Sequence, residues 1–503
     1  MSTVTKPPHK RELFGHPVGL YVLFFTEMWE RFSYYGMRAL LTLYMTAETL
    51  KNDPQSGLGW TTTEALALYG WYTMLVYVMS IPGGFLADRY LGQKKAVTIG
   101  AILLTIGHGV LAIDDLWAYY TGLGFVILGV GMLKPNISTM VGGLYKQNDI
   151  RRDKGFSIFY VGINLGSFLA SITVGIVAAV YGWHYGFGLA GIGMFVGLLV
   201  YLYGHRFLVH VGNEPTMEEK ASDISLGQLF TQLLKSPLQL AIVIVLLAYS
   251  VYAGFTYEGP DNWGYGVLYI FLSLITGIMM MIYKNLNGKV EKDRYVVLLI
   301  SLLMVIVFWG SFEQMGGLMN LYAQEKTNRM FLGWEVPAAW FQAANAGFII
   351  LFAVAVANYW AKRKLMGVGF IYMVFASLQY ESSGSSAMYW LVLTYLFHTI
   401  GELCLSPVSL SFFTKLAPAR YMALMMGVYW AATGLGNKVA GIVGESSVQA
   451  GEQKVFGGLF IFAVLFGTLV LLLIKPLKRL THGAEDKETI VSVEHEVETI
   501  ERG

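Results

Sequence analysis

The chain has 503 residues, of which 55% are hydrophobic and only 14% are charged. Soluble globular proteins usually carry about a quarter charged residues, so this composition excludes most soluble classes and predicts an integral membrane protein. The formal net charge of +2 gives no indication of a nucleic-acid partner. The single cysteine, Cys404, excludes an intramolecular disulfide and a cysteine metal cluster.

Apolar runs that could cross a membrane recur along nearly the whole chain. A helix needs about 20 residues to cross the ~30 Å hydrocarbon core of a bilayer. We therefore predict an all-α, multi-pass protein with fourteen transmembrane helices. The predicted spans are 19–46, 64–87, 96–113, 117–141, 156–180, 186–209, 237–257, 264–283, 295–319, 337–361, 366–380, 386–413, 421–444 and 455–474.

The basic residues gather in alternate loops, as expected if those loops are cytoplasmic. With the N-terminus inside, 25 of the 35 Lys and Arg residues fall on the inner side, four in the opposite loops and two in the C-terminal tail. Both termini are therefore predicted to be cytoplasmic, and residues 1–17 lack the pattern of a cleavable signal peptide. The remaining four, at membrane depth, are Arg31, Arg38, Lys134 and Lys438.

The first span carries charges that a lipid-facing helix should not carry. Glu27, Glu30, Arg31 and Arg38 stand within twelve residues. An ionisable residue at the bilayer centre costs at least ~2.5 kcal/mol. On a helix, these four side chains share a sector of roughly 140° with two tyrosines, Tyr34 and Tyr35. This sector predicts a wet, charged cavity inside a helical bundle.

A short loop after the second span combines glycines, one acid and several bases. Its sequence is GGFLADRYLGQKK, from Gly83 to Lys95. It resembles the loop between helices two and three of the major facilitator superfamily. The alternative interpretation, a charged loop that only fixes the topology, explains the bases alone.

Three other segments resemble the proton-dependent oligopeptide transporter family of that superfamily. EMWERFSYYGMRALLTLYM (Glu27 to Met45) resembles the ExxERFxYYG signature of helix one, and FSIFYVGINLGSFLA (Phe156 to Ala170) the FYxxINxG signature of helix five. GELCLSPVSL (Gly401 to Leu410) resembles the helix-ten motif, and GMLKPNIS (Gly131 to Ser138) and WGSFEQMGG (Trp309 to Gly317) agree with them. The segments follow in the family's order, so the chain is identified as a member.

The resemblance implies a facilitator fold, in which twelve spans form two six-helix bundles. The two surplus spans fall where bacterial members of the family insert a helical hairpin. We therefore expect an N-terminal bundle at 1–209, the hairpin with its linkers at 210–290, a C-terminal bundle at 291–475 and a charged cytoplasmic tail at 476–503.

A short peptide is a zwitterion, so its site needs a cation, an anion and a tolerant middle. The resemblance implies that Arg38 and Lys134 face the peptide carboxylate, and that Glu402, with Asn164 and Asn345, faces the amino terminus and backbone. Side-chain pockets would be lined by Tyr34, Tyr35, Tyr77, Trp309 and Trp430, with Ser406 nearby. Ordinary helix packing is the alternative for each aromatic residue, and Tyr72 is close enough to Tyr77 to be the true counterpart.

Proton coupling requires a titrating group and a partner that responds to it. Our hypothesis is that a proton on Glu30, or on the Glu27/Glu30 pair, releases Lys134 or Arg31 and changes the salt bridges between the halves. Arg38 would then pair with Glu313 as an extracellular gate, and Lys134 with Glu402 in the absence of peptide. A static buried ion network is the alternative, although buried pairs are poor stabilisers.

Two polar residues have no place in this scheme. Lys438 is expected to snorkel to the interface from the penultimate helix. His398, one turn before Glu402, is expected to be a hydrogen-bonded packing residue. No metal site, cofactor site or catalytic nucleophile is predicted.

The sequence thus predicts a proton-coupled symporter that imports di- and tripeptides across a bacterial inner membrane, acting as a monomer and not as an enzyme. Its loops are too short for the large extracellular domain of animal members. One alternative is a transporter of nitrate or another small organic anion from the same family. A drug exporter is disfavoured by Arg38 and Lys134, and an intramembrane enzyme by the lack of a nucleophile or metal set.

Overall fold

The computed structural model describes residues 12–145, 149, 151–214, 231, 234–256, 262–359, 366–418 and 422–484. Within these ranges the protein is mostly helical, and each of the fourteen predicted spans coincides with a helix or a run of consecutive helices. The predicted all-α class is therefore confirmed. Seven of the described helical segments are long and apolar enough to cross a membrane by length and composition.

The first half of the chain begins with a two-residue hairpin and continues through six spans. Its elements are β1 (Glu12–Leu13), β2 (His16–Pro17), α1 (Val18–Thr46), α2 (Thr62–Val78), α3 (Ser80–Leu86), η1 (Ala87–Leu91), α4 (Gln93–Leu111), α5 (Leu116–Gly143), α6 (Arg151–Tyr181), α7 (Trp183–Gly204) and η2 (His205–Phe207). The second predicted span is thus divided into α2, α3 and η1.

The rest of the chain holds the inserted hairpin and six further spans. Its elements are α10 (Pro237–Thr256), α11 (Asn262–Lys284), α12 (Gly288–Phe312), η3 (Glu313–Met315), α13 (Leu318–Glu325), β3 (Thr327–Asn328), β4 (Met330–Phe331), β5 (Trp334–Glu335), α14 (Trp340–Tyr359), α15 (Met366–Ser383), β6 (Ser386–Ala387), α16 (Met388–Leu416), α17 (Met422–Ala450) and α18 (Glu452–Leu480).

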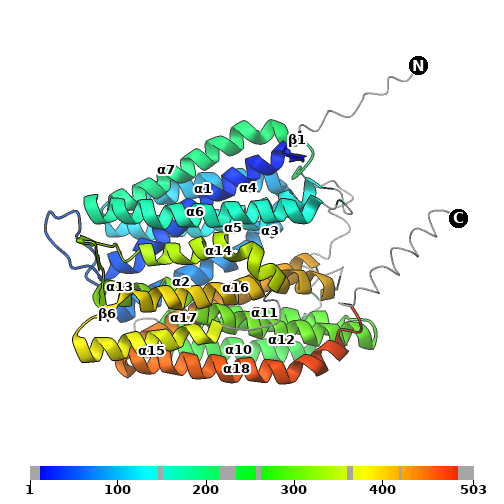
Figure 1. Ribbon diagram of the computed structural model, residues 1–503. Helices are drawn as coiled ribbons and strands as arrows, with labels where there is room; N and C mark the ends of the chain where they lie inside the picture. The colour runs from blue at the N-terminus through cyan, green and yellow to red at the C-terminus, as the bar shows by residue number, and fades with distance from the viewer. Residues whose placement is uncertain are drawn as a thin grey trace, which may run out of the picture.

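The helices form two packed halves with the inserted hairpin beside the second. In the first half α1 packs on α6 and α7, and α4 packs on α5; in the second, α15 packs on α16 and α18, and α12 on α17. Figure 1 shows these halves as upper and lower groups of roughly parallel helices. The described chain starts and ends, at β1 and the end of α18, at the same end of the bundle (Figure 1). The exact domain boundaries stay predictions.

The halves meet along α2 against α17 and α6 against α14. Glycines allow the first pair to approach closely: a Cβ atom on Gly441 would lie 2.9 Å from the Cα atom of Gly70. Without a hydrophobic driving force between helices in lipid, such close packing of small residues stabilises the contact. The span that contains α12 and α13 breaks at Glu313, where a Cβ atom on Gly316 would overlap the Tyr69 hydroxyl. Only glycine fits there, so this break places Glu313 against α2.

Candidate functional site

The charged cluster of α1 lies entirely inside the first half. The Arg31 Nε atom lies 2.7 Å from Glu27 Oε1 and 3.0 Å from Glu30 Oε2. All three side chains are buried, with Glu30 completely inaccessible. Two carboxylates therefore share one guanidinium, and Glu27 Oε2 and Glu30 Oε1 have no hydrogen-bond partner in the described part of the chain. A single proton on this pair would balance its charge.

Lys134 does not join that cluster by a salt bridge. Its Nζ atom lies 3.6 Å from the centroid of the Tyr77 ring and 4.9 Å from that of Trp430. The two rings stack at 6.1 Å, one from α2 and one from α17. Lys134 thus points from α5 into the interface between the halves, held by ring faces. Of the two candidate tyrosines, Tyr77 is the one in contact with it.

The predicted Lys134–Glu402 pair is not formed in this structure. Glu402 Oε2 instead accepts a hydrogen bond from Asn345 Nδ2 at 3.0 Å, and the same amide donates to Thr399 Oγ1 at 2.9 Å. These residues belong to α14 and α16, so they form a unit of the second half. In this structure Lys134 and Glu402 therefore have neutral partners and no ion pair with each other.

Arg38 forms an ion pair that joins the two halves. Its Nη1 atom lies 2.9 Å and 3.2 Å from the two carboxylate oxygens of Glu313, and Nη2 donates to Gln342 Oε1 at 3.3 Å. The Tyr69 hydroxyl donates to Glu313 Oε1 at 2.5 Å. The Cζ atom of Arg38 also lies 4.7 Å from the centroid of the Tyr35 ring. The Arg38–Glu313 pair, in which Nη1 alone contacts both carboxylate oxygens, is buried at both ends.

Other polar bonds accompany the Arg38 pair at the same level. Asn320 Nδ2 donates to the Ala39 carbonyl at 3.0 Å, and Thr42 Oγ1 to the Gly316 carbonyl at 3.3 Å. Trp340 Nε1 donates to the Ile172 carbonyl at 3.1 Å. In the described part of the chain, the polar bonds that join the halves lie between Lys134 and the end of the bundle opposite β1. The interface is therefore closed at the end away from β1.

The remaining predicted residues are more dispersed. Asn164 donates its amide to the Tyr160 carbonyl of its own helix at 2.9 Å. Tyr34 packs edge-to-face on Tyr35 at 5.4 Å, and Trp309 packs on Phe312 at 5.3 Å. The side chain of Ser406 lies outside the described residues.

Sequence reasoning missed Tyr69 and Gln342. Both bond the Arg38–Glu313 pair, and they come from α2 and α14. Tyr69 lies two helical turns before Tyr77, so the helical spacing of tyrosines in the second span was the available signal. No signal in the sequence marked Gln342.

The snorkelling predicted for Lys438 is wrong. The residue is only 1% exposed, and its Nζ atom lies 3.6 Å from Glu445 Oε1 and 4.6 Å from the centroid of the Trp71 ring. Because α17 packs directly on α2, the side chain is enclosed between the halves and cannot reach the membrane surface. It is a third buried cation at the interface, after Arg38 and Lys134.

His398 is a packing residue, but the predicted hydrogen bond is absent. Neither ring nitrogen has a hydrogen-bond partner among the described residues. The ring packs on Phe370 at 4.6 Å and on Gly369, where a Cβ atom would lie 2.6 Å from His398 Cδ2. Apolar neighbours on α12 and α15 enclose it and leave no room for a polar partner.

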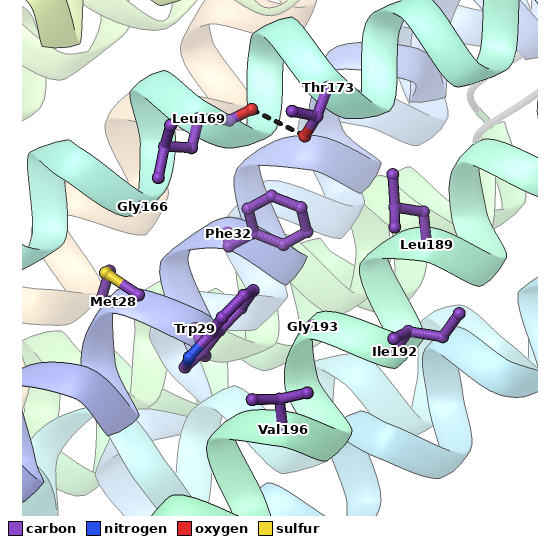
Figure 2. A pocket seen from close by; sticks show the side chains of 10 residues that line it. All are labelled: Met28, Trp29, Phe32, Gly166, Leu169, Thr173, Leu189, Ile192, Gly193 and Val196. Atoms are coloured by element: carbon purple, nitrogen blue, oxygen red, sulfur yellow. Dashed lines mark hydrogen bonds between the residues drawn. The ribbon is translucent and has the colours of Figure 1, made fainter.

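The opposite face of α1 is apolar. Figure 2 shows a groove between α1, α6 and α7, into which Trp29 and Phe32 project. Its lining contains no charged side chain, and its only drawn hydrogen bond runs from Thr173 to the Leu169 carbonyl of the same helix (Figure 2). The charged sector of α1 therefore faces the interior, as the helical spacing predicts, while the groove lies on the outside of the first half.

Comparisons with known proteins give one consistent family. A model of the POT family matches residues 94–458. The peptide transporter YePEPT of Yersinia enterocolitica is 36% identical, with 97% of this chain and 100% of that protein covered. A di-/tripeptide transporter of Lactococcus lactis subsp. cremoris is 34% identical, with 94% and 98% covered. A crystal structure of a POT family transporter in complex with a thioalcohol-conjugated peptide matches with a TM-score of 0.78 at 33% identity, covering 93% and 98%.

Proposed function

Since this chain belongs to the POT family, as its sequence motifs predict, we propose that it is a proton-coupled symporter that imports di- and tripeptides. Transport follows alternating access, in which the two halves rock about a site near the middle of the membrane. The names of the relatives support a peptide substrate, since two of them are peptide transporters. We place the protein in a bacterial inner membrane as a monomer, with both termini in the cytoplasm.

The arrangement of Lys134 and Glu402 carries the proposal. The two residues belong to opposite halves, and neither forms a salt bridge with a described residue. A buried charge without a counter-ion is unfavourable unless a ligand completes it. A zwitterionic peptide would supply both missing counter-ions, with its carboxylate at Lys134 and its ammonium at Glu402. Amino-terminal recognition would then include Asn345, and the Tyr77 and Trp430 rings would face the side chains.

The α1 cluster supplies the proton site in this proposal. Glu27 and Glu30 share Arg31, so the cluster carries one negative charge more than it can balance. Protonation of Glu30 would remove that excess and change the field at Lys134 across the interface. The energy supply is adequate, because one charge moved through ~100 mV is worth ~2.3 kcal/mol, or about fifty-fold accumulation.

The Arg38–Glu313 pair is the proposed gate. With the N-terminus in the cytoplasm, the end of the interface that this pair closes faces outward. Substrate entry from outside would require Arg38 to leave Glu313. A peptide carboxylate beside Arg38 would assist this exchange, since it replaces one anion by another.

Uptake of labelled dialanine into liposomes tests the proposal. An inward proton gradient with a negative interior should drive accumulation, which an uncoupler should abolish and Glu402→Gln should cripple. A folded preparation that accumulates no peptide but takes up nitrate or another anion would replace this proposal by the same-family alternative. Peptide-dependent proton influx also separates symport from drug export, because an exporter admits protons only while it expels substrate.

A further inference from the structure

The connection between α13 and α14 exposes a cluster of large apolar side chains. β4 pairs antiparallel with β5, with Met330 opposite Glu335 and Phe331 opposite Trp334. Leu332 and Gly333 form the two-residue turn between them. The exposed fractions at this tip are 56% for Met330, 58% for Phe331, 92% for Leu332 and 46% for Trp334.

The hairpin has a defined geometry. Leu332 and Gly333 have φ angles of +50° and +82°, and positive φ at both central residues is typical of the type I′ turn that suits a tight hairpin. At the base, Arg329 Nη2 lies 2.7 Å from Glu335 Oε1, and Arg329 Nη1 donates to the Val336 carbonyl at 2.7 Å. A residue as bulky as leucine rarely adopts positive φ. The turn and the contacts of Arg329 thus define one hairpin conformation, in which the four apolar side chains are exposed.

The hairpin is fastened to the membrane-spanning helices. The Trp334 ring lies 5.1 Å from the ring of Trp340 at the start of α14. Trp340 in turn donates to the Ile172 carbonyl of α6. The hairpin thus lies where two spans end, at the end of the bundle that holds α13 and β6 in Figure 1.

We propose that residues 330–334 are an interfacial anchor that inserts into the outer boundary of the surrounding bilayer. Four neighbouring apolar side chains in water would be unfavourable at about 25 cal/mol per Å², and contiguous apolar patches mark interaction sites. Trp concentrates where headgroups meet acyl chains, and Trp, Phe and Leu form the inserted face of interfacial segments. The patch sits beside the start of α14, through the contact of Trp334 with Trp340, so it lies next to the point where a span meets the membrane boundary.

The anchor would give the two halves different attachments to the membrane. The hairpin belongs to the second half, and its base is bonded within that half through Arg329. An inserted tip would hold the entry to α14 at a constant depth while the halves rock. This inference depends on the membrane-spanning fold and not on the identity of the substrate.

Spin-label accessibility tests the anchor on the full-length protein. In a Cys404→Ser background, Leu332→Cys is labelled in liposomes of phosphatidylethanolamine and phosphatidylglycerol. Collisions with oxygen, which concentrates in the bilayer, are compared with collisions with a water-soluble nickel chelate. The matched control is Lys51→Cys, an exposed residue of the α1–α2 connection at the same end of the bundle. Phe331→Cys repeats the measurement without altering the turn.

We expect the labels at 331 and 332 to collide at least several-fold more with oxygen than with nickel, and the label at 51 to show the reverse. Equal nickel access at 332 and 51 would overturn the proposal, because the tip would then stand in water. Protection of 332 from both reagents would also overturn it, since a second copy or another protein would then cover the tip.

Discussion

Arg38 and Lys134 are both buried cations at the interface between the halves, but they are satisfied in different ways. Arg38 has a carboxylate, an amide and a tyrosine ring around it. Among the described residues, Lys134 contacts the faces of Tyr77 and Trp430 and no carboxylate. A guanidinium paired with a carboxylate joins two surfaces, although Arg38 Nε itself has no hydrogen-bond partner among the described residues, whereas an ammonium on ring faces keeps its capacity for an anion. Under the proposed function, a substrate carboxylate would therefore compete with Glu313 at Arg38 but with no described carboxylate at Lys134.

The largest expected effect is at Lys134. Lys134→Gln should lower kcat/KM for dialanine uptake by about 100-fold, since a charge-assisted bond to a carboxylate is worth roughly 1.5–3 kcal/mol. Proteoliposome uptake measures it. The matched control is Lys438→Gln, which removes the other buried lysine and should cost less than about tenfold. Equal losses in both variants would show that removal of any buried cation impairs uptake. Lys134 would then have no special role in binding the substrate carboxylate.

The second effect concerns the drive for transport. Glu30→Gln should abolish proton-driven accumulation, a loss of about fifty-fold from a potential of ~100 mV alone, yet leave exchange of labelled for unlabelled peptide intact. The variant carries a neutral mimic of the protonated acid, so the α1 cluster no longer responds to protons. Glu64→Gln, at an exposed helix cap, serves as the control. Full pH-driven uptake by Glu30→Gln would move the proton site elsewhere.

The third effect tests whether the Arg38–Glu313 pair holds the two halves together. Glu313→Gln removes one charge of a buried pair, and should shift the population away from this closed conformation by about tenfold or more. Spin labels at Lys51 and Glu381, on opposite halves in a Cys404→Ser background, should then report longer distances by pulsed electron resonance. The control, Glu335→Gln, breaks the pair with Arg329 at the base of the β4–β5 hairpin, away from Arg38 and Glu313. An unchanged distance distribution in Glu313→Gln would mean that the pair is not the gate.

A smaller effect is expected from the rings beside Lys134. Tyr77→Leu removes the ring face and should raise KM about three- to tenfold, the range of a cation–π contact worth about 0.5–1.5 kcal/mol. Tyr77→Phe keeps the face and should leave KM nearly unchanged. If Tyr77→Phe were as impaired as Tyr77→Leu, the hydroxyl and not the ring face would be the functional group.

The smallest effect is expected outside the membrane, at Asp149. Hydrogen bonds from Arg151 lower the pKa of this carboxyl from 3.8 to about 2. Its stabilising contribution is therefore present above the unfolded value and is lost only as the pH falls toward 2. Asp149→Asn should leave the shape of the uptake profile between about pH 5 and 8 unchanged. A displaced profile would show that the α5–α6 connection takes part in proton sensing.

Much of the molecule could be predicted from the sequence. Hydrophobic length and the alternation of basic loops predicted all fourteen spans, because these patterns are properties of short segments. The family expected from the motifs is confirmed by the comparisons. The orientation of Glu27, Glu30 and Arg31 toward the interior also followed from helical spacing alone. Contacts inside one helix need no knowledge of its neighbours.

Contacts between distant helices were harder to predict. Arg38 and Glu313 were expected to meet, from the resemblance, but their partners Tyr69 and Gln342 were not. Lys438 was assigned to the membrane surface because its helix position alone suggested it. The packing of α17 on α2 buries it instead against Trp71. His398 was given a hydrogen bond that its apolar neighbours do not provide.

Composition, length and local periodicity were enough to predict a multi-pass helical protein with charged residues inside its first span, and the motifs predicted its family. The pairing of Arg38 across the halves and the position of Lys134 on ring faces became clear only from the packing of the helices. The reason is physical: the partner of a buried charge is set by which helices pack together, and that depends on the whole arrangement of the chain.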